Sequence, residues 1–212
     1  MEFESIAVGA FQANAWLVWD PHSLKGVLVD PGDEPARLLS WIAAKGVRVE
    51  ALLATHGHLD HVSAAEDLSR ELGGLPLLLH PGDRFLLEVL PETRKQFGLP
   101  PAEPPSLVED LGQGERIPLG GEFLEILHVP GHSPGSVAFL GGGAVLTGDL
   151  LFKGSVGRTD LPGGDGPLLF RSIREKILSL PGETRVLPGH GPASTVGEEK
   201  GSNPFLLGIL EG

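Results

Sequence analysis

The chain has 212 residues, a length typical of one large domain or two small ones. It contains no cysteine, which excludes disulfides, iron–sulfur clusters, cysteine-ligated zinc and cysteine nucleophiles. The net charge of −12, without any basic run, argues against binding to nucleic acid or to an anionic membrane. The acidic first five residues do not resemble a signal peptide, and no apolar stretch approaches the roughly 18 residues that span a bilayer. We therefore expect a cytoplasmic protein.

The first half of the chain alternates predicted strands and helices. Short apolar, aromatic and β-branched runs between turn residues predict strands at 4–10, 13–19, 26–30, 49–54 and 75–79. Apolar residues at helical spacing predict helices at 35–45, 60–72 and 83–90.

The second half repeats this order after a segment rich in proline and charge, residues 91–106, which we expect to be an exposed connector. Strands are predicted at 123–129, 136–140, 144–147 and 185–187, and a helix at 167–180. No linker long enough to separate two independent domains is present. Two similar α/β halves favour two sheets packed face to face with helices outside.

A stretch rich in metal-binding side chains, Thr55-His-Gly-His-Leu-Asp-His61, follows an apolar strand and opens a helix. Ligands in α/β proteins collect at such strand ends. In extended backbone, His56 and His58 point to the same side and can chelate one cation. Asp60 and His61 lie where the chain turns into the helix, so they point elsewhere and suit a second cation close to the first. The stretch therefore predicts a metal site.

Three further candidate ligands follow predicted strands elsewhere. His132 and His190 each come after a Pro-Gly turn, and Asp149 follows the strand at 144–147. Histidine and aspartate without cysteine suit zinc, iron or manganese. Asp30 is expected to be a turn residue or a partner that orients a ligand. The remaining histidines are interpreted as ordinary polar residues: His22, His80 and His128.

The pattern His-x-His-x-Asp-His at residues 56–61, followed by His132, Asp149 and His190, resembles the metallo-β-lactamase superfamily. The resemblance implies an α/β fold, the four-layer αββα sandwich, with residues 1–212 forming a single domain. It also implies that one metal is held by His56, His58 and His132. A second metal would be held by Asp60, His61 and His190, with Asp149 bridging both.

Within this superfamily the chain is similar to the glyoxalase II-like hydrolases, the hydroxyacylglutathione hydrolases. The similarity lies in residues 147–152, 157–163, 188–192 and 203–205. It implies hydrolysis of a small-molecule thioester such as S-lactoylglutathione. Arg158 lies where the family carries a basic residue near the thiol part of the substrate, and a surface or loop-ordering arginine is the alternative interpretation. The sequence ends shortly after His190, so we expect the helical C-terminal domain of full-length glyoxalase II to be missing. The tyrosines with which that family contacts its substrate are also missing, since the chain has no tyrosine.

The cofactors implied are two divalent metal ions, with zinc expected and iron or manganese compatible. Two cations about 3.5–4 Å apart lower the pKa of a bridging water to about 7 and polarise a carbonyl oxygen. The resulting hydroxide would attack the thioester, and Asp60 would act as a catalytic residue by moving the proton.

Other functions of the same fold remain open. Persulfide dioxygenases carry a Gly-Arg-Thr-Asp stretch like that at 157–160, and such an enzyme would use a single iron held by His56, His132 and Asp149. A lactonase or β-lactamase would use the same metals with a different pocket, and a non-catalytic metal-binding protein is a third class. The intact second set of ligands favours a binuclear hydrolase. The sequence indicates neither the acyl group of the substrate nor the oligomeric state.

Overall fold

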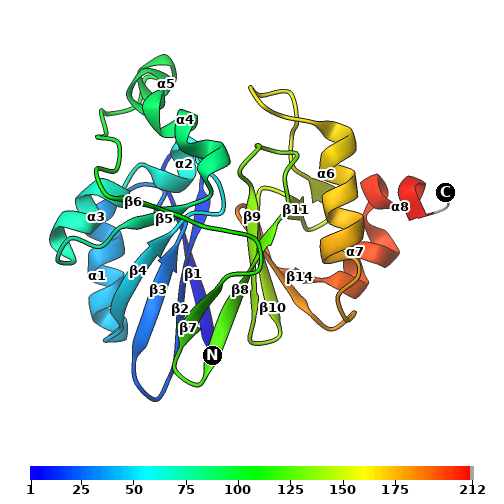
Figure 1. The fold of residues 1–212 in the computed structure, drawn as a ribbon, viewed down its shortest axis with the longest axis horizontal. Helices are drawn as coiled ribbons and strands as arrows, with labels where there is room; N and C mark the ends of the chain where they lie inside the picture. Colours follow the sequence, from blue (N-terminus) through cyan, green and yellow to red (C-terminus); the bar gives the residue numbers. More distant parts are fainter. Residues whose placement is uncertain (211–212) are drawn as a thin grey trace.

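Two six-stranded sheets pack face to face, with helices on both outer faces, in the computed structural model (Figure 1). The structure describes residues 1–210. The N-terminal half of the chain builds one sheet and its helices, and the C-terminal half builds the other. The predicted αββα sandwich is confirmed.

The strands of the first sheet lie side by side in chain order. They are β1 (Glu2–Val8), β2 (Ala13–Trp19), β3 (Lys25–Val29), β4 (Arg48–Leu53), β5 (Leu77–Leu79) and β6 (Val108–Asp110). The pairs from β3 to β6 are parallel, so the carboxyl ends of these strands meet at one edge. The helices of this half are α1 (Pro35–Lys45), α2 (Leu59–Val62), α3 (Ala65–Glu71), α4 (Arg84–Glu88) and α5 (Leu90–Gln96), with a 3-10 turn at Pro81–Asp83.

The second sheet is mostly antiparallel. Its strands are β7 (Arg116–Leu119), β8 (Glu122–His128), β9 (Val137–Gly141), β10 (Ala144–Gly148), β13 (Arg185–Pro188) and β14 (Ser194–Thr195), in the spatial order β14-β13-β10-β9-β8-β7. Strands β10 and β13 are parallel. A separate hairpin consists of β11 (Leu151–Phe152) and β12 (Ser155–Val156). The helices are α6 (Gly166–Ser172), a π-helical segment at Ile173–Ile177, α7 (Val196–Ser202) and α8 (Pro204–Leu210).

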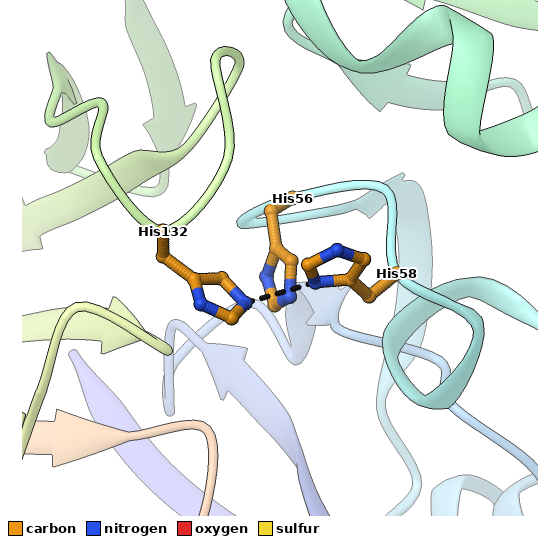
Figure 2. A group of neighbouring side chains, drawn as sticks. All are labelled: His56, His58 and His132. Atoms are coloured by element: carbon orange, nitrogen blue, oxygen red, sulfur yellow. Dashed lines mark hydrogen bonds between the residues drawn. The ribbon is translucent and has the colours of Figure 1, made fainter. Parts of the chain in front are cut away.

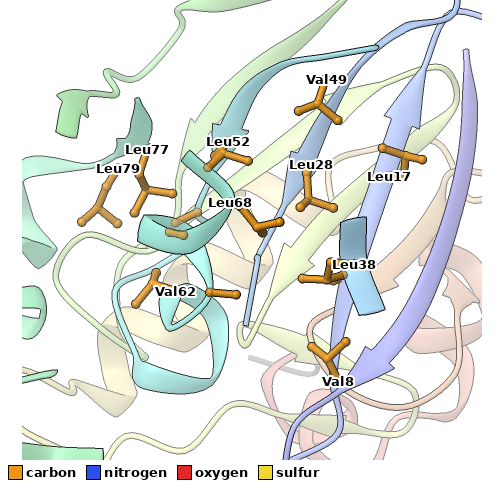
Figure 3. Close-up of a cluster of buried hydrophobic side chains, with 14 of the residues drawn as sticks. Val8, Leu17, Leu28, Leu38, Val49, Leu52, Val62, Leu68, Leu77 and Leu79 are labelled. Atoms are coloured by element: carbon orange, nitrogen blue, oxygen red, sulfur yellow. The ribbon is translucent and has the colours of Figure 1, made fainter. Parts of the chain in front are cut away.

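Three apolar clusters separate the four layers. The first lies between the first sheet and its helices, where Leu28 and Leu52 pack with Leu38 of α1 and Leu68 of α3 (Figure 3). The second lies between the two sheets and includes Val29, the neighbour of Leu28 in sequence. Because adjacent strand residues point to opposite faces and both faces are buried, the central strands are continuous apolar runs.

The third cluster lies between the second sheet and α6. Val145 of β10 and Val186 of β13 pack there with Leu169 and Ile173. The fold therefore has an apolar layer wherever two layers of secondary structure meet, as a sandwich of this kind requires.

Some predicted elements are wrong in detail. The expected helix at 60–72 is two helices, because the main-chain N–H of Ala64 donates to Pro31 O at 3.0 Å at the break. The expected exposed connector at 91–106 begins inside α5, since Pro91 lies in the first turn of the helix, where a missing N–H costs nothing. The segment after His190 was not assigned any element, although Thr195 and Glu198 form a capping box that starts α7.

Among the helices of residues 1–210, none combines the length and the apolar character needed to cross a bilayer.

Candidate metal centre

Four loops bring the predicted ligands together, one after each of β4, β8, β10 and β13. The loop after β4 carries four of these residues, and each of the others carries one. Main-chain hydrogen bonds join the loops: Val137 N–H donates to Thr55 O at 2.7 Å, and Gly189 N–H donates to Gly148 O at 2.8 Å. The candidate ligands thus lie on backbone that both sheets hold in place.

The two Pro-Gly turns serve different purposes. At Gly189 a Cβ atom would lie 2.3 Å from Oδ1 of Asp149 and 2.8 Å from Cε1 of His61, so only glycine leaves room for the candidate ligands. At Gly131 the close neighbour is instead the backbone of Leu169 in α6, and φ is +139°. The first glycine makes space for the site, while the second lets the chain pass close to a helix.

His56, His58 and His132 form one group, which we call the three-histidine cluster. Each offers a ring nitrogen, and these atoms lie within 4.8 Å of one another. Figure 2 shows the three rings converging from two loops that are distant in sequence. Nδ1 of His58 lies 2.8 Å from Nε2 of His132. The predicted grouping of His56 with His58 on one side of the loop agrees with this geometry.

Asp60, His61 and His190 form a second group, which we call the mixed cluster. Oδ2 of Asp60 lies 3.2 Å from Nε2 of His190 and 3.6 Å from Nε2 of His61. His61 is fully buried in α2, whereas His190 is partly exposed after β13. The turn into a helix thus places Asp60 and His61 in a second group, as predicted, but the two groups are adjacent, since the ring centroids of His56 and His61 lie 4.2 Å apart.

Asp149 lies between the two clusters. Its Oδ1 is 3.4 Å from Nε2 of His61, and its Oδ2 is 3.5 Å from Nε2 of His190 and 3.8 Å from Nε2 of His132. It also groups with His56 and His61 as a third possible ligand set. A single carboxylate therefore reaches both clusters.

Asp30 orients two of the histidines. Its carboxylate accepts hydrogen bonds from the N–H and the Oγ1–H of Thr55, at 2.7 and 2.8 Å, and from Nδ1 of His61 at 3.0 Å. Because the hydroxyl proton of Thr55 goes to Asp30, Oγ1 accepts from Nδ1 of His56, 3.0 Å away. In both imidazoles Nδ1 therefore donates its proton to a fixed acceptor, which leaves Nε2 as the nitrogen that a metal ion can bind. Asp30 is the orienting partner that the sequence suggested.

His132 is held in the same tautomer by the main chain. Its Nδ1 donates to the carbonyl oxygen of Arg158 at 2.8 Å, which leaves the Nε2 lone pair facing His58. Sequence reasoning missed this contact, since a carbonyl group carries no side-chain signal. It considered only the side chain of Arg158, which is exposed and forms two 2.7 Å hydrogen bonds with Asp160.

Burial keeps two histidines of the three-histidine cluster, His56 and His58, uncharged. It lowers the pKa of His56 well below the usual value, and the neighbouring histidines lower it further. Burial and His132 lower the pKa of His58 to about 4. A neutral imidazole is the form that binds a metal ion, so the cluster can accept a cation without releasing protons from these two rings.

Opposite charges dominate the mixed cluster. Burial by itself would raise the pKa of Asp60, but His61 and His190 hold it well below its usual range. The pKa of Asp149 is lowered in the same way, mainly by His61. Burial would lower the pKa of His61, but Asp60, Asp149 and Asp30 together raise it well above its usual value. The carboxylates are therefore ionised and ready to bind a cation.

Three buried polar atoms at the centre lack a hydrogen-bond partner: Nε2 of His56, Nε2 of His61 and Oδ1 of Asp149. A buried polar atom without a partner is costly, and such atoms call for a specific explanation. All three are good donors to a borderline metal ion and all point into the space between the loops. The residues present therefore fit divalent cations.

A second buried carboxylate, Asp83, ties the loops of the three-histidine cluster together. It accepts hydrogen bonds from Gly57 N–H at 2.9 Å, Gly135 N–H at 2.6 Å and the Ser133 hydroxyl at 2.6 Å. Sequence analysis assigned Asp83 only to a helix. Its place directly after the predicted strand at 75–79, like the other site residues, was the available signal.

The other histidines lie outside the two clusters. His22 is on an exposed turn, and the rings of His80 and His128 stack on each other with centroids 4.2 Å apart. None of the three belongs to a ligand group in the part of the chain that the structure describes. Their interpretation as ordinary polar residues agrees with the structure.

The chain belongs to the metallo-beta-lactamase superfamily, whose profile matches residues 8–190. It is a metallo-hydrolase of that superfamily, as its relatives and its ligand clusters indicate.

Two curated relatives match almost the whole chain. The chain is 43% identical over 211 residues to the hydroxyacylglutathione hydrolase GloC of Haemophilus influenzae, covering 97% of this chain and 98% of that protein. It is 40% identical to the probable metallo-hydrolase YqgX of Bacillus subtilis, covering 99% of each.

Two solved structures are also similar to this chain over nearly its whole length. TTHA1623 in a di-iron-bound form is 47% identical, with a TM-score of 0.88, and the match covers 96% of this chain and 100% of that chain. The B3 metallo-beta-lactamase BLEG-1 is 36% identical, with a TM-score of 0.87, and the match covers 97% and 99% of the two chains.

Proposed function

We propose that the protein is a binuclear metal-dependent hydrolase of a small-molecule thioester, with S-lactoylglutathione as the first substrate to test. Each cluster would hold one divalent cation, and Asp149 would contact both. Zinc is the expected metal, and iron and manganese suit the same ligands. The di-iron form of TTHA1623 supports a pair of cations in this scaffold, and the activity in GloC's name supports the thioester.

The observation that carries the proposal is the position of Asp149 between two complete ligand clusters. A single-metal site would need only one cluster, and the ionised Asp60 and the buried His61 would then have no role. A second cation between Asp60 and Asp149 would give both carboxylates a positive partner.

When bound, two divalent cations would lower the pKa of a water molecule toward neutrality and polarise the substrate carbonyl. The chain's own residues would do the rest. Ionised Asp60 faces the cavity beside His190 and would accept the proton of the attacking water. Asp30 and the carbonyl of Arg158 would keep His61 and His132 in the ligating tautomer.

The test is the loss of thioester absorbance of S-lactoylglutathione with metal-loaded protein. We expect hydrolysis that a chelator abolishes and that added metal restores. His58→Ala and Asp60→Ala should each lose turnover while circular dichroism shows an intact fold. The control is His22→Ala, which removes an exposed histidine and should leave the rate unchanged. Wild-type activity in both cluster variants would refute the binuclear mechanism.

A persulfide dioxygenase is the second candidate, favoured by the 3.8 Å approach of Asp149 to His132 in the three-histidine cluster. It would use one iron per chain held by His56, His132 and Asp149. Oxygen consumption with glutathione persulfide, together with one iron per chain, would support it over the hydrolase. Two metals per chain and no oxygen uptake would exclude it.

A further inference from the structure

A cavity of about 590 Å³ opens onto both clusters, and its two sides differ in chemistry. Polar side chains of the clusters, including His58, Asp60 and His190, line one side. Mostly apolar side chains line the rest, with Thr93 and Gln96 of α5 among them; the apolar ones include Phe11, Phe85, Leu86, Val89, Phe97 and Leu161. The volume is in the usual range for a small-molecule site of about 300–1,000 Å³, and far exceeds what a lactoyl group needs.

The apolar side, which we call the apolar wall, is exposed to a degree that folding alone does not explain. Phe11, Phe85, Val89 and Phe97 are between 37% and 59% exposed. They are four of the nine large apolar side chains that are exposed in the described chain. Exposed apolar groups gathered at one place mark a binding surface.

The apolar wall comes from three separate segments. Phe11 lies in the turn between β1 and β2, Phe85 in α4, and Phe97 at the end of α5. Phe11 and Phe97 meet edge to face, with ring centroids 5.3 Å apart. Such a contact fixes the rings with their remaining surface open to the cavity. The wall is therefore assembled before any ligand binds.

Apart from the cations that the two clusters would hold, little in the cavity lining would attract a peptide-like anion. Arg158 is the single cationic side chain among the residues that line the cavity in the described part of the chain, and Asp160 holds its guanidinium with two hydrogen bonds. A glutathione thioester brings two carboxylates, and no free lysine or arginine lines the cavity to receive them.

From this geometry we infer that the preferred substrate is a thioester whose larger flank is uncharged and apolar, and that this flank lies against the apolar wall of Phe11, Phe85, Val89 and Phe97. The inference rests on the proposed thioester hydrolase function. The apolar flank is either the acyl chain or the thiol. The acyl chain is bonded directly to the reacting carbonyl carbon and the thiol is bonded to it through sulfur, so either can reach the apolar wall.

Two substrate series test it on the metal-loaded enzyme. In the first, N-acetylcysteamine is the constant thiol and the acyl group runs through acetyl, butyryl, hexanoyl and octanoyl. In the second, acetyl is constant and the thiol is N-acetylcysteamine, hexanethiol or benzyl mercaptan. Each methylene that is buried should raise kcat/KM about fourfold. We expect at least a tenfold rise in one series, and that series identifies which flank meets the wall.

Variants of the apolar wall test whether these side chains cause the rise of kcat/KM with longer substrates. Phe97→Ala and Phe85→Ala should each reduce the ratio of kcat/KM between the long and the acetyl substrate by fivefold or more. The matched control is Phe205→Ala, an exposed phenylalanine on α8, which should keep the wild-type ratio. A flat response in both series, or a ratio that Phe97→Ala and Phe85→Ala leave intact, would overturn the inference.

A binding measurement separates this inference from the proposed function. The probes are the thioethers S-octyl- and S-methyl-N-acetylcysteamine, titrated by calorimetry. Tighter binding of the octyl compound that Phe97→Ala removes supports the apolar flank even if no thioester is hydrolysed, in which case only the proposed function fails. Equal affinities overturn the inference. The inference is also overturned if sedimentation shows a dimer that Phe97→Ala converts to a monomer, while the ratio of kcat/KM between the long and the acetyl substrate stays constant. The apolar wall would then be a subunit contact.

Discussion

The two ligand clusters differ in how the fold prepares them for a cation. In the three-histidine cluster, burial lowers the pKa of His56 and of His58, so these two rings are uncharged. The mixed cluster contains an ionised carboxylate beside a histidine whose pKa is raised. The first cluster depends on bringing neutral nitrogen atoms together, and the second depends on balancing charge. The centre thus attracts a cation in two ways: by the placement of neutral nitrogen atoms in one cluster and by negative charge in the other.

Two buried aspartates also support the clusters, in different ways. Asp30 contacts a ligand ring of the mixed cluster directly, through Nδ1 of His61. Asp83 touches no ligand side chain and instead holds the loops of the three-histidine cluster through Gly57, Ser133 and Gly135. Loss of Asp30 should therefore weaken metal binding, whereas loss of Asp83 should weaken the fold.

The largest effect is expected from the residue that both clusters share. Asp149→Ala removes the carboxylate that lies near His61, His132 and His190. We expect kcat to fall on the order of 10³-fold, since both cations would lose a ligand and the nucleophile its position. Metal analysis and kcat/KM on a thioester measure this. Unchanged metal content at two per chain would show that the two clusters do not depend on Asp149.

Asp83→Ala should act on stability. Three buried donors would lose their acceptor, at about 1–3 kcal/mol each, so we expect the free energy of unfolding to fall by about 3–5 kcal/mol. Urea unfolding of the metal-free protein measures it. The control Asp67→Ala, on the exposed face of α3, should change stability by about 0.5 kcal/mol or less. A similar loss in both variants would contradict a special role for Asp83.

Asp30→Asn should weaken metal binding by about 10–100-fold, the usual effect of losing a group that orients a ligand. One Asp30 oxygen accepts from Thr55 N–H and the other accepts from both the Thr55 hydroxyl and Nδ1 of His61. An amide replaces one of these oxygens with an NH2 group, so a donor would then face a donor on one side. Competition with a chromophoric chelator measures the affinity. Asp20→Asn changes an aspartate in an exposed turn and serves as control. Because Asp30 contacts His61 directly and His56 only through Thr55, the loss of affinity should be larger for the metal of the mixed cluster. Equal losses for both metals would contradict this difference.

The smallest effect on the metals is expected for Arg158→Ala. The contact with His132 uses the main-chain carbonyl, which alanine retains. The ion pair with Asp160 is exposed, and such pairs contribute little to stability. Metal affinity should stay within about twofold. A rise in KM alone would support the substrate contact predicted from the sequence, whereas loss of metal would show that the side chain is needed to position His132.

Most of the site could be predicted because its residues have a strong local signal. His56, His58, Asp60 and His61 lie within six residues and follow an apolar strand. The supporting contacts had no such signal. Asp83 is one aspartate among many acidic residues, and its role exists only because β5 ends beside the loop that carries Ser133 and Gly135.

The same distinction holds for the fold: elements with a clear local pattern could be predicted, and elements without one could not. Long runs such as β2 and β8 are visible from their composition, whereas β11, β12 and β14 have two residues each and show no period. The break between α2 and α3 depends on a hydrogen bond from Ala64 to Pro31, which no helical pattern in residues 60–72 reveals.

The sequence by itself determined which side chains can ligate a metal, their order, and the double-sided burial of the strands, because each is a property of residues near one another in the chain. Only the tertiary structure decided that Asp149 lies between the clusters, that Arg158 acts through its carbonyl, and that Phe11 and Phe97 share one wall. These are contacts between distant segments, and the packing of two sheets sets their distances.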